Sequence, residues 1–302
     1  MATAQFGRVI TAMITPFTED GAVDYESAVA LAKHLVAHGS EGLLVGGTTG
    51  EGATMTAEEK LKLYTLIVDA VGKRGEGKKV PVMGNIGTIS TADTIAFGNK
   101  AKETGIDCAL VIVPFYVKPN QEGMYQHFTA VANGVDLPLV LYNVPGRTGV
   151  SIQPETIKRI VDECPNVVGI KDATGNWDQV TKEKALLPED FMIYSGDDAF
   201  TLPVLLAGGV GIISVSAHVI GDDMLAMVDA FEKGDLEKAR ELHLKMYEIN
   251  KGMFFTASPT PVKTATNLVG QPGGHFRLPM VEPTEAEKAK VRQMLENYGG
   301  LL

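Results

Sequence analysis

The sequence predicts an α/β chain that folds as a (β/α)8 TIM barrel with a C-terminal helical extension. Short apolar runs alternate with helical segments about eight times between residues 8 and 234. Eight strand-then-helix units are the number that such a barrel needs. From residue 235 to residue 302 the pattern predicts helices only. We therefore expect a barrel over residues 1–234 and a helical extension packed on it over residues 235–302.

The predicted strands are apolar runs rich in Val, Ile and Leu. Runs without polar alternation are typical of parallel strands, because such strands are covered on both faces. The runs lie at residues 8–15, 42–46, 80–85, 108–113, 137–143, 167–172, 191–195 and 211–215.

Capping residues indicate where the helices begin. Asp24 is a typical N-cap for a helix that runs to about His38, and Thr56 with Glu59 has the spacing of a capping box. Similar signals place the other helix starts at about residues 91, 121, 154, 197, 222, 235, 259 and 284. An open doubly wound sheet would give the same alternation, but it usually carries a glycine fingerprint after its first strand. Residues 11–19 contain none, so the barrel is the preferred prediction.

Composition and charge exclude several classes of function. Of the 302 residues, 45% are hydrophobic and 21% are charged, which is ordinary for a globular protein, and the net charge is -10. An acidic chain without a basic stripe is not suited to nucleic acid. The first residues lack a secretion signal, and no apolar run approaches membrane-spanning length. Cys108 and Cys164 lie on predicted buried elements, so we expect a cytoplasmic protein without disulfides.

Lys171 stands at the end of the apolar run 167–172. A lysine at the tip of a parallel strand emerges where the sheet ends and a cleft can begin. Desolvation there would disfavour its charged form and lower its pKa, and a neutral amine can form an imine with a ketone. Taken alone, a strand-end lysine with its stem packed and its head in water is the commoner situation.

The residues at the ends of the predicted strands are rich in hydroxyls, with one lysine and one arginine. Each of these residues alone suits an ordinary structural role, but the carboxyl ends of barrel strands meet on one rim, which is where barrel active sites form. The residues are Thr15, Thr48, Thr49, Glu51, Asn85, Tyr116, Tyr142, Asn143, Arg147, Lys171, Asp172, Ser195, Asp197, Ser214 and Ser216.

This set suits carbonyl chemistry better than metal or phosphate chemistry. Lysine would supply the nucleophile, hydroxyls could relay protons, and Arg147 could hold a carboxylate in a bidentate fork. The turn at residues 47–51 offers backbone N–H groups to an anion. The six histidines show no zinc spacing, Asp197-Asp198 and Asp222-Asp223 are interpreted as helix N-terminal charges, and no nucleotide or flavin motif is present. We expect an unphosphorylated substrate, no cofactor and no metal.

Four motifs, in this order and spacing, resemble the dihydrodipicolinate synthase / N-acetylneuraminate lyase family of class I lyase barrels, from about residue 7 to residue 270. They are residues 47–51 (GTTGE), 142–149 (YNVPGRTG), 169–175 (GIKDATG) and 195–198 (SGDD). The resemblance is to the synthase branch, and it implies condensation of pyruvate with L-aspartate 4-semialdehyde to 4-hydroxy-tetrahydrodipicolinate, in the diaminopimelate and lysine pathway.

The resemblance also implies roles for individual residues. Lys171 would form the imine with pyruvate, with Thr48, Tyr142 and Tyr116 as the hydroxyl relay and Tyr116 coming from a neighbouring subunit. The substrate-binding positions would be Thr49 for the pyruvate carboxylate, Arg147 for the semialdehyde carboxylate, and Gly196 and Ile213 through their backbone. The usual assembly of the family is a homotetramer built from two tight dimers.

The chain departs from feedback-inhibited members of the family at a lysine-binding interface. Ala57, Lys60, Ile89 and Phe115 stand where those members carry histidines, an asparagine and a second tyrosine, so we expect weak or absent inhibition by lysine. Ser258 and Thr260 also differ from many relatives. Two other functions stay open: an aldolase or dehydratase acting on 2-keto-3-deoxy sugar acids or related oxo acids, and a catalytically silent barrel that binds a ligand or a partner.

Overall fold

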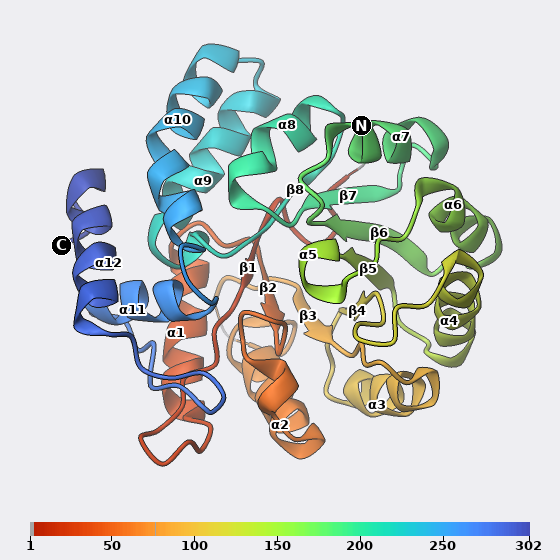
Figure 1. Cartoon of the computed structure of the whole chain (residues 1–302), viewed down its shortest axis with the longest axis horizontal. Helices are drawn as coiled ribbons and strands as arrows, with labels where there is room; N and C mark the ends of the chain where they lie inside the picture. Colours follow the sequence, from red (N-terminus) through yellow and green to blue (C-terminus); the bar gives the residue numbers. More distant parts are fainter. Residues whose placement is uncertain (1–2, 76) are drawn as a thin grey trace.

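Eight parallel strands close into a barrel in the order β1-β2-β3-β4-β5-β6-β7-β8, with β8 pairing back to β1 (Figure 1). The structure is a computed structural model and describes residues 3–75 and 77–302. The strands are β1 (Val9–Ala12), β2 (Gly42–Val45), β3 (Val82–Asn85), β4 (Cys108–Ile112), β5 (Leu139–Asn143), β6 (Val167–Asp172), β7 (Met192–Ser195) and β8 (Gly211–Ser214). The predicted barrel is confirmed, and its closure rules out the open sheet.

Helices follow the strands around the outside of the barrel. They are α1 (Tyr25–Ala37), α2 (Ala57–Val71), α3 (Thr91–Glu103), α4 (Gln121–Gly134), α5 (Pro145–Thr148), α6 (Pro154–Glu163), α7 (Trp177–Leu186), α8 (Thr201–Leu206) and α9 (Ala217–Glu232). Two 3-10 turns, η1 (Gly52–Thr54) and η2 (Asp198–Phe200), lie in the loops after β2 and β7.

The capping signals located most helix starts correctly. The Asp24 carboxylate accepts a hydrogen bond from Ser27 N at 3.0 Å, and Thr56 with Glu59 forms a complete capping box. A carboxylate or hydroxyl at this position satisfies backbone N–H groups that have no partner in the first helical turn.

One predicted helix start was wrong. Helix α9 begins at Ala217, not near residue 222, and it bends at Ile220, where φ is -132°. A Cβ at Gly221 would lie 2.2 Å from the His38 carbonyl oxygen at the end of α1, so this glycine permits close packing of α9 on α1. Asp222 and Asp223 therefore lie inside α9 and are not the N-terminal charges that the sequence suggested.

The chain ends in three further helices beside α9 and α1 (Figure 1): α10 (Leu236–Gly252), α11 (Thr260–Leu268) and α12 (Glu285–Tyr298). Helix α10 packs along α9, and α12 packs against α10 and α11. The division of the chain between residues 234 and 235 stays a prediction. Within the described residues, no helix combines the length and the apolar character needed to cross a membrane.

Two apolar cores lie on the two sides of the barrel wall. The larger lies between the strands and the helices, and the smaller fills the interior of the barrel. The interior is packed with side chains such as Ile10, Leu44, Met83 and Tyr194, so it is a solid core and not a channel. A polar side chain that enters this interior from a strand end is therefore desolvated on most sides.

Candidate active site

Lys171 projects into the barrel interior near the end of β6. Only 5% of the residue is exposed. Burial lowers the pKa of Lys171 to about 8; Arg147 also lowers it, while the carboxylate of Asp198 opposes this shift. Roughly a tenth of the amine is then neutral at pH 7, far more than for an ordinary lysine. The expected strand-end lysine is thus a buried amine that can act as a nucleophile.

Tyr142 lies beside Lys171 on the neighbouring strand. The two residues are paired in register between β5 and β6, and Lys171 Nζ is 4.6 Å from the centroid of the Tyr142 ring. Burial raises the pKa of Tyr142, while Arg147 and a hydrogen bond with the Thr48 side chain act in the opposite direction. The phenol therefore keeps its proton at neutral pH and can pass it between Thr48 and a group bound at Lys171.

The turn after β2 presents Thr48 and Thr49 to the cavity that Lys171 also lines. Gly46 has a left-handed φ of +66°, and a Cβ at Gly52 would lie 1.9 Å from the Gly46 carbonyl oxygen, so this tight turn needs both glycines. Side chains from adjacent strands support it. Thr15 Oγ1 donates to the Gly50 carbonyl at 2.7 Å, and Asn85 Nδ2 donates to the Gly46 carbonyl at 3.1 Å.

The turn does not use the backbone N–H groups of Thr49 and Gly50 in its own hydrogen bonds. Among the described residues, none accepts a hydrogen bond from either group. Successive N–H groups in a turn form a concave site that favours anions. Together with the Thr48 and Thr49 hydroxyls, they provide donors suited to a carboxylate close to the amine of Lys171.

A cavity of about 380 Å³ joins these groups. Its walls combine polar side chains, Lys171, Tyr142, Thr48 and Thr49 among them, with apolar residues from β1, β2 and β4 and from the loops that follow β2, β3 and β4. The lining residues are Ala12, Leu44, Gly47, Thr48, Thr49, Glu51, Gly52, Ala53, Met55, Lys60, Asn85, Gly87, Thr88, Ile89, Leu110, Ile112, Phe115, Tyr142 and Lys171. The structure thus brings together four of the eight predicted site residues.

The other four predicted site residues do not line this cavity. Arg147 is exposed on α5, the single turn that directly follows β5 (Figure 1), and it is close enough to affect the pKa of both Lys171 and Tyr142. Tyr116 is 87% exposed and has a left-handed φ of 67°. Gly196 N donates to the Asp172 carbonyl at 2.6 Å, and Ile213 is packed inside the barrel.

Asp198 was missed as a member of the site. The sequence suggested a helix N-terminal charge, which fits Asp197, whose side chain accepts from Ala199 N at 2.9 Å. Asp198 instead is 1% exposed and accepts from the Ser214 hydroxyl and from Val215 N at 3.0 Å. Burial raises its pKa to about 6. No local signal distinguishes these two adjacent aspartates.

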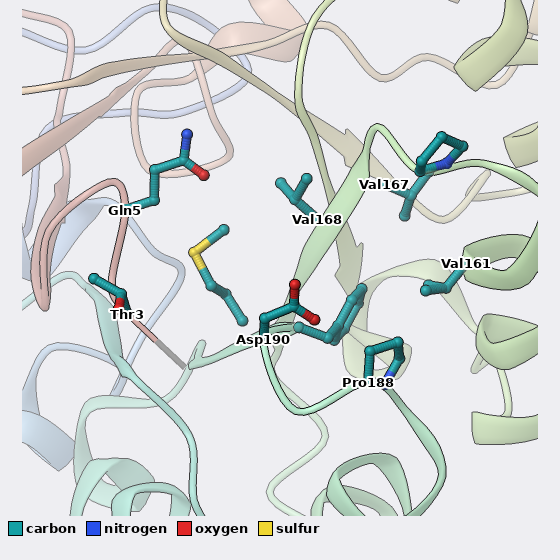
Figure 2. Close-up of a pocket in the computed structure, with 10 residues that line it drawn as sticks. Thr3, Gln5, Val161, Val167, Val168, Pro188 and Asp190 are labelled. Carbon is teal, nitrogen blue, oxygen red and sulfur yellow. The ribbon is translucent and has the colours of Figure 1, made fainter. Parts of the chain in front are cut away.

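A larger cavity of about 620 Å³ lies at the opposite end of the barrel, where β6 and β7 begin (Figure 2). Figure 2 shows Val167, Val168, Pro188 and Asp190 around it, together with Thr3 and Gln5 from the start of the chain. It holds no lysine and lies away from the carboxyl ends of the strands, where barrel enzymes carry out their chemistry. We therefore place the candidate site at Lys171.

Comparison with known proteins gives consistent matches over almost the whole chain. Residues 5–298 match the model of the Dihydrodipicolinate synthetase family. A 4-hydroxy-tetrahydrodipicolinate synthase from Heliobacterium modesticaldum is 48% identical over 295 residues, which is 98% of this chain and 96% of that protein.

Solved structures agree in fold. A DHDPS from Cyanidioschyzon merolae with lysine bound has a TM-score of 0.94 and 41% identity, covering 98% of this chain and 99% of that one. A dihydrodipicolinate synthase from Acinetobacter baumannii complexed with pyruvate has a TM-score of 0.92 and 35% identity, with 98% and 99% covered.

Proposed function

The chain belongs to the Dihydrodipicolinate synthetase family, and from this we propose that it condenses pyruvate with L-aspartate 4-semialdehyde to 4-hydroxy-tetrahydrodipicolinate, in the diaminopimelate and lysine pathway. The observation that carries the proposal is the buried amine of Lys171 beside Tyr142, in one cavity with the turn that bears Thr48 and Thr49. The pyruvate found in the Acinetobacter baumannii relative supports the choice of first substrate.

Lys171 would begin the reaction as a nucleophile. Its neutral amine adds to the ketone carbon of pyruvate and gives a carbinolamine, and loss of the hydroxyl as water gives an imine. Tyr142, which is hydrogen-bonded to Thr48, would donate the proton that the departing hydroxyl needs. The N–H groups and hydroxyls of the Thr48–Thr49 turn would meanwhile hold the pyruvate carboxylate.

The condensation follows from the chemistry of the imine. Loss of a methyl proton converts the imine to an enamine, whose carbon adds to the aldehyde of the second substrate and forms the new carbon–carbon bond. The amino group of the semialdehyde then attacks the imine carbon, closes the ring and releases Lys171. Arg147, on α5 after the end of β5, would hold the second carboxylate.

Trapping the imine tests this function. Borohydride with pyruvate is expected to fix a covalent adduct on Lys171, which peptide mass spectrometry would locate, and Lys171→Met should abolish it. An adduct on another residue, or none, would contradict the mechanism. In parallel, a coupled assay should show turnover with aspartate semialdehyde and none with 2-keto-3-deoxy sugar acids.

Arg147→Ala tests the second-substrate role. We expect pyruvate adduct formation to continue, while condensation falls about 10- to 100-fold because one hydrogen-bonded charge pair is lost. Arg159→Ala is the matched control, since Arg159 is half-exposed on α6 and pairs with Glu122. Equal loss of adduct formation and condensation in Arg147→Ala would remove the role assigned to Arg147.

The proposal includes a homotetramer of two tight dimers in which Tyr116 completes the site of a neighbouring subunit. The high exposure of Tyr116 and of Val117 beside it, at 87% and 57%, supports this arrangement. Mixing two inactive variants, Tyr116→Phe and Lys171→Met, should restore part of the activity if Tyr116 acts between subunits. No restoration in mixed oligomers would contradict it. A cytoplasmic location belongs to the same proposal, and the free thiols of Cys108 and Cys164 suit a reducing compartment.

A further inference from the structure

Lys263 and Glu51 form a buried ion pair that connects the C-terminal extension to the candidate site. Lys263 Nζ, on α11, lies 2.6 Å from Glu51 Oε1, and the two side chains are 0% and 2% exposed. The ammonium also donates to the His275 carbonyl and lies 4.5 Å from the centroid of the Phe17 ring and 4.9 Å from that of the Phe276 ring. A charge in such surroundings is tolerated only with a close partner.

Glu51 has an unusual backbone conformation. Its φ of 52° is left-handed, a conformation that disfavours side chains with a Cβ, and among the described residues only Tyr116 and Lys118 share it without being glycine. Such strain persists where the surroundings hold the residue in place, and it gathers at functional sites. Here the holding contacts come from Lys263 and from Arg277 N, which donates to Glu51 Oε2 at 3.4 Å.

The strained residue belongs to the turn that carries the substrate-binding hydroxyls. Glu51 N donates to the Thr48 carbonyl at 3.1 Å, and Gly52 N donates to the Gly47 carbonyl at 3.0 Å. Glu51, Thr48 and Thr49 all line the cavity in front of Lys171. A shift of the Glu51 carboxylate would therefore be passed directly to the hydroxyls and N–H groups that face the ligand.

We propose that Lys263 is a positioning residue for pyruvate: by holding Glu51, it fixes the turn 46–52 in the conformation that binds the substrate carboxylate. This inference rests on the proposed function and adds a role for the C-terminal helices, which otherwise lie outside the barrel. Local sequence patterns could not predict this contact, because 212 residues separate Lys263 from Glu51 in the chain.

A merely structural ion pair would hold α11 on the barrel without affecting substrate binding. The double variant Glu51→Gln/Lys263→Met distinguishes the structural role from the positioning role. Replacing both charges with neutral groups of similar shape removes the unpaired buried charge that each single variant leaves behind, so stability should largely return. The charge pair that fixes the turn is still absent, so weak pyruvate binding should remain.

The experiment measures borohydride trapping against pyruvate concentration, with KM for both substrates and the thermal midpoint of each variant. For Lys263→Met and for the double variant we expect the pyruvate concentration at half-maximal trapping to rise about 10- to 100-fold. KM for the semialdehyde should stay near its wild-type value, because Arg147 lies on α5, outside the turn 46–52.

Arg8→Gln is the matched control. Arg8 holds a partly buried ion-pair group with Glu41, Asp229 and Glu232 next to a cavity at the opposite end of the barrel. Its loss should lower the thermal midpoint and leave pyruvate trapping unchanged. It thereby shows whether reduced stability alone weakens binding.

Three outcomes would decide against the positioning role. A double variant with a near-wild-type midpoint and unchanged pyruvate trapping would overturn it. So would equal increases in KM for both substrates, or loss of folding in all the variants of the pair, which would make the contact structural. Wild-type protein that forms no adduct would instead remove the proposed function itself.

Discussion

Tyr142 and Lys171 face each other in register on adjacent strands, with the lysine Nζ 4.6 Å from the centroid of the tyrosine ring. Lys171 has a second tyrosine neighbour in register, Tyr194 on β7, but the Tyr194 hydroxyl donates to Met192 Sδ at 3.6 Å and belongs to the packed interior. Lys171 thus has a tyrosine on each neighbouring strand, and of the two only Tyr142 lines the cavity. The cavity therefore lies on the Tyr142 side of Lys171, and Tyr194 supplies a matched control for substitutions of Tyr142.

The pH dependence of imine formation should follow the neutral fraction of Lys171. Because burial lowers the pKa of Lys171 to about 8, the trapping rate at limiting pyruvate should rise about tenfold per pH unit below pH 8 and level off above it. Quenched-flow trapping from about pH 6 to about pH 10, a range that spans the titration of Lys171, checks this. A midpoint near 10.5, the ordinary value for lysine, would contradict it.

Asp198→Asn provides the control for this pH profile. The Asp198 charge raises the pKa of Lys171, so its removal should move the midpoint of the trapping rate to lower pH. An unchanged midpoint would show that the two groups do not interact.

Lys171→Met should make the unliganded protein more stable at neutral pH. At pH 7 the wild type holds a charged ammonium in a buried position, and lowering its pKa from 10.5 to about 8 corresponds to at most ~3 kcal/mol of destabilisation. Methionine keeps the packing and removes that cost. Urea unfolding at pH 7 should show the gain.

The stability difference between Lys171→Met and the wild type should depend on pH. The lysine pKa is lower in the folded state than in the unfolded state, so the wild type gains stability as pH rises from about 8 to 10.5. The difference between variant and wild type should shrink over that window. A difference that grows with pH would refute the explanation.

Tyr142→Phe should slow imine formation and leave the fold intact. The ring packing remains, but the hydroxyl that bonds with Thr48 is lost, and removing a proton donor of this kind costs about 10²- to 10⁴-fold. Single-turnover trapping gives the rate. Tyr194→Phe is the control and should stay close to the wild-type rate; a similar loss in both variants would point to packing as the cause.

L-Lysine at millimolar concentration should inhibit weakly or not at all. Lys60 lines the cavity together with Ile89 and Phe115, and its ammonium would repel an amine ligand. This contrasts with the relative from Cyanidioschyzon merolae, which has lysine bound. A coupled assay with added lysine tests it, and strong inhibition would show that the Lys60 charge is not a barrier.

Local patterns predicted what depends on a few adjacent residues. The capping box at Thr56 and the strand at residues 167–172 were predicted at the correct positions. Predictions failed for aspartates, because the same residue type can lie at a helix start, inside a helix or in the core. Asp222 and Asp223 lie inside α9 rather than at its start, and of the adjacent Asp197 and Asp198 one caps a turn while the other enters the core.

By itself, the sequence determined the alternation of strands and helices, the helix caps and the position of Lys171 at a strand end, because each depends on side chains within one or two turns of the chain. The tertiary structure alone decided which groups meet. The register in which β5 pairs with β6 places Tyr142 beside Lys171, and the C-terminal helices bring Lys263 to Glu51 across 212 residues. Burial then sets the pKa of the amine, and burial is a property of everything packed around a residue.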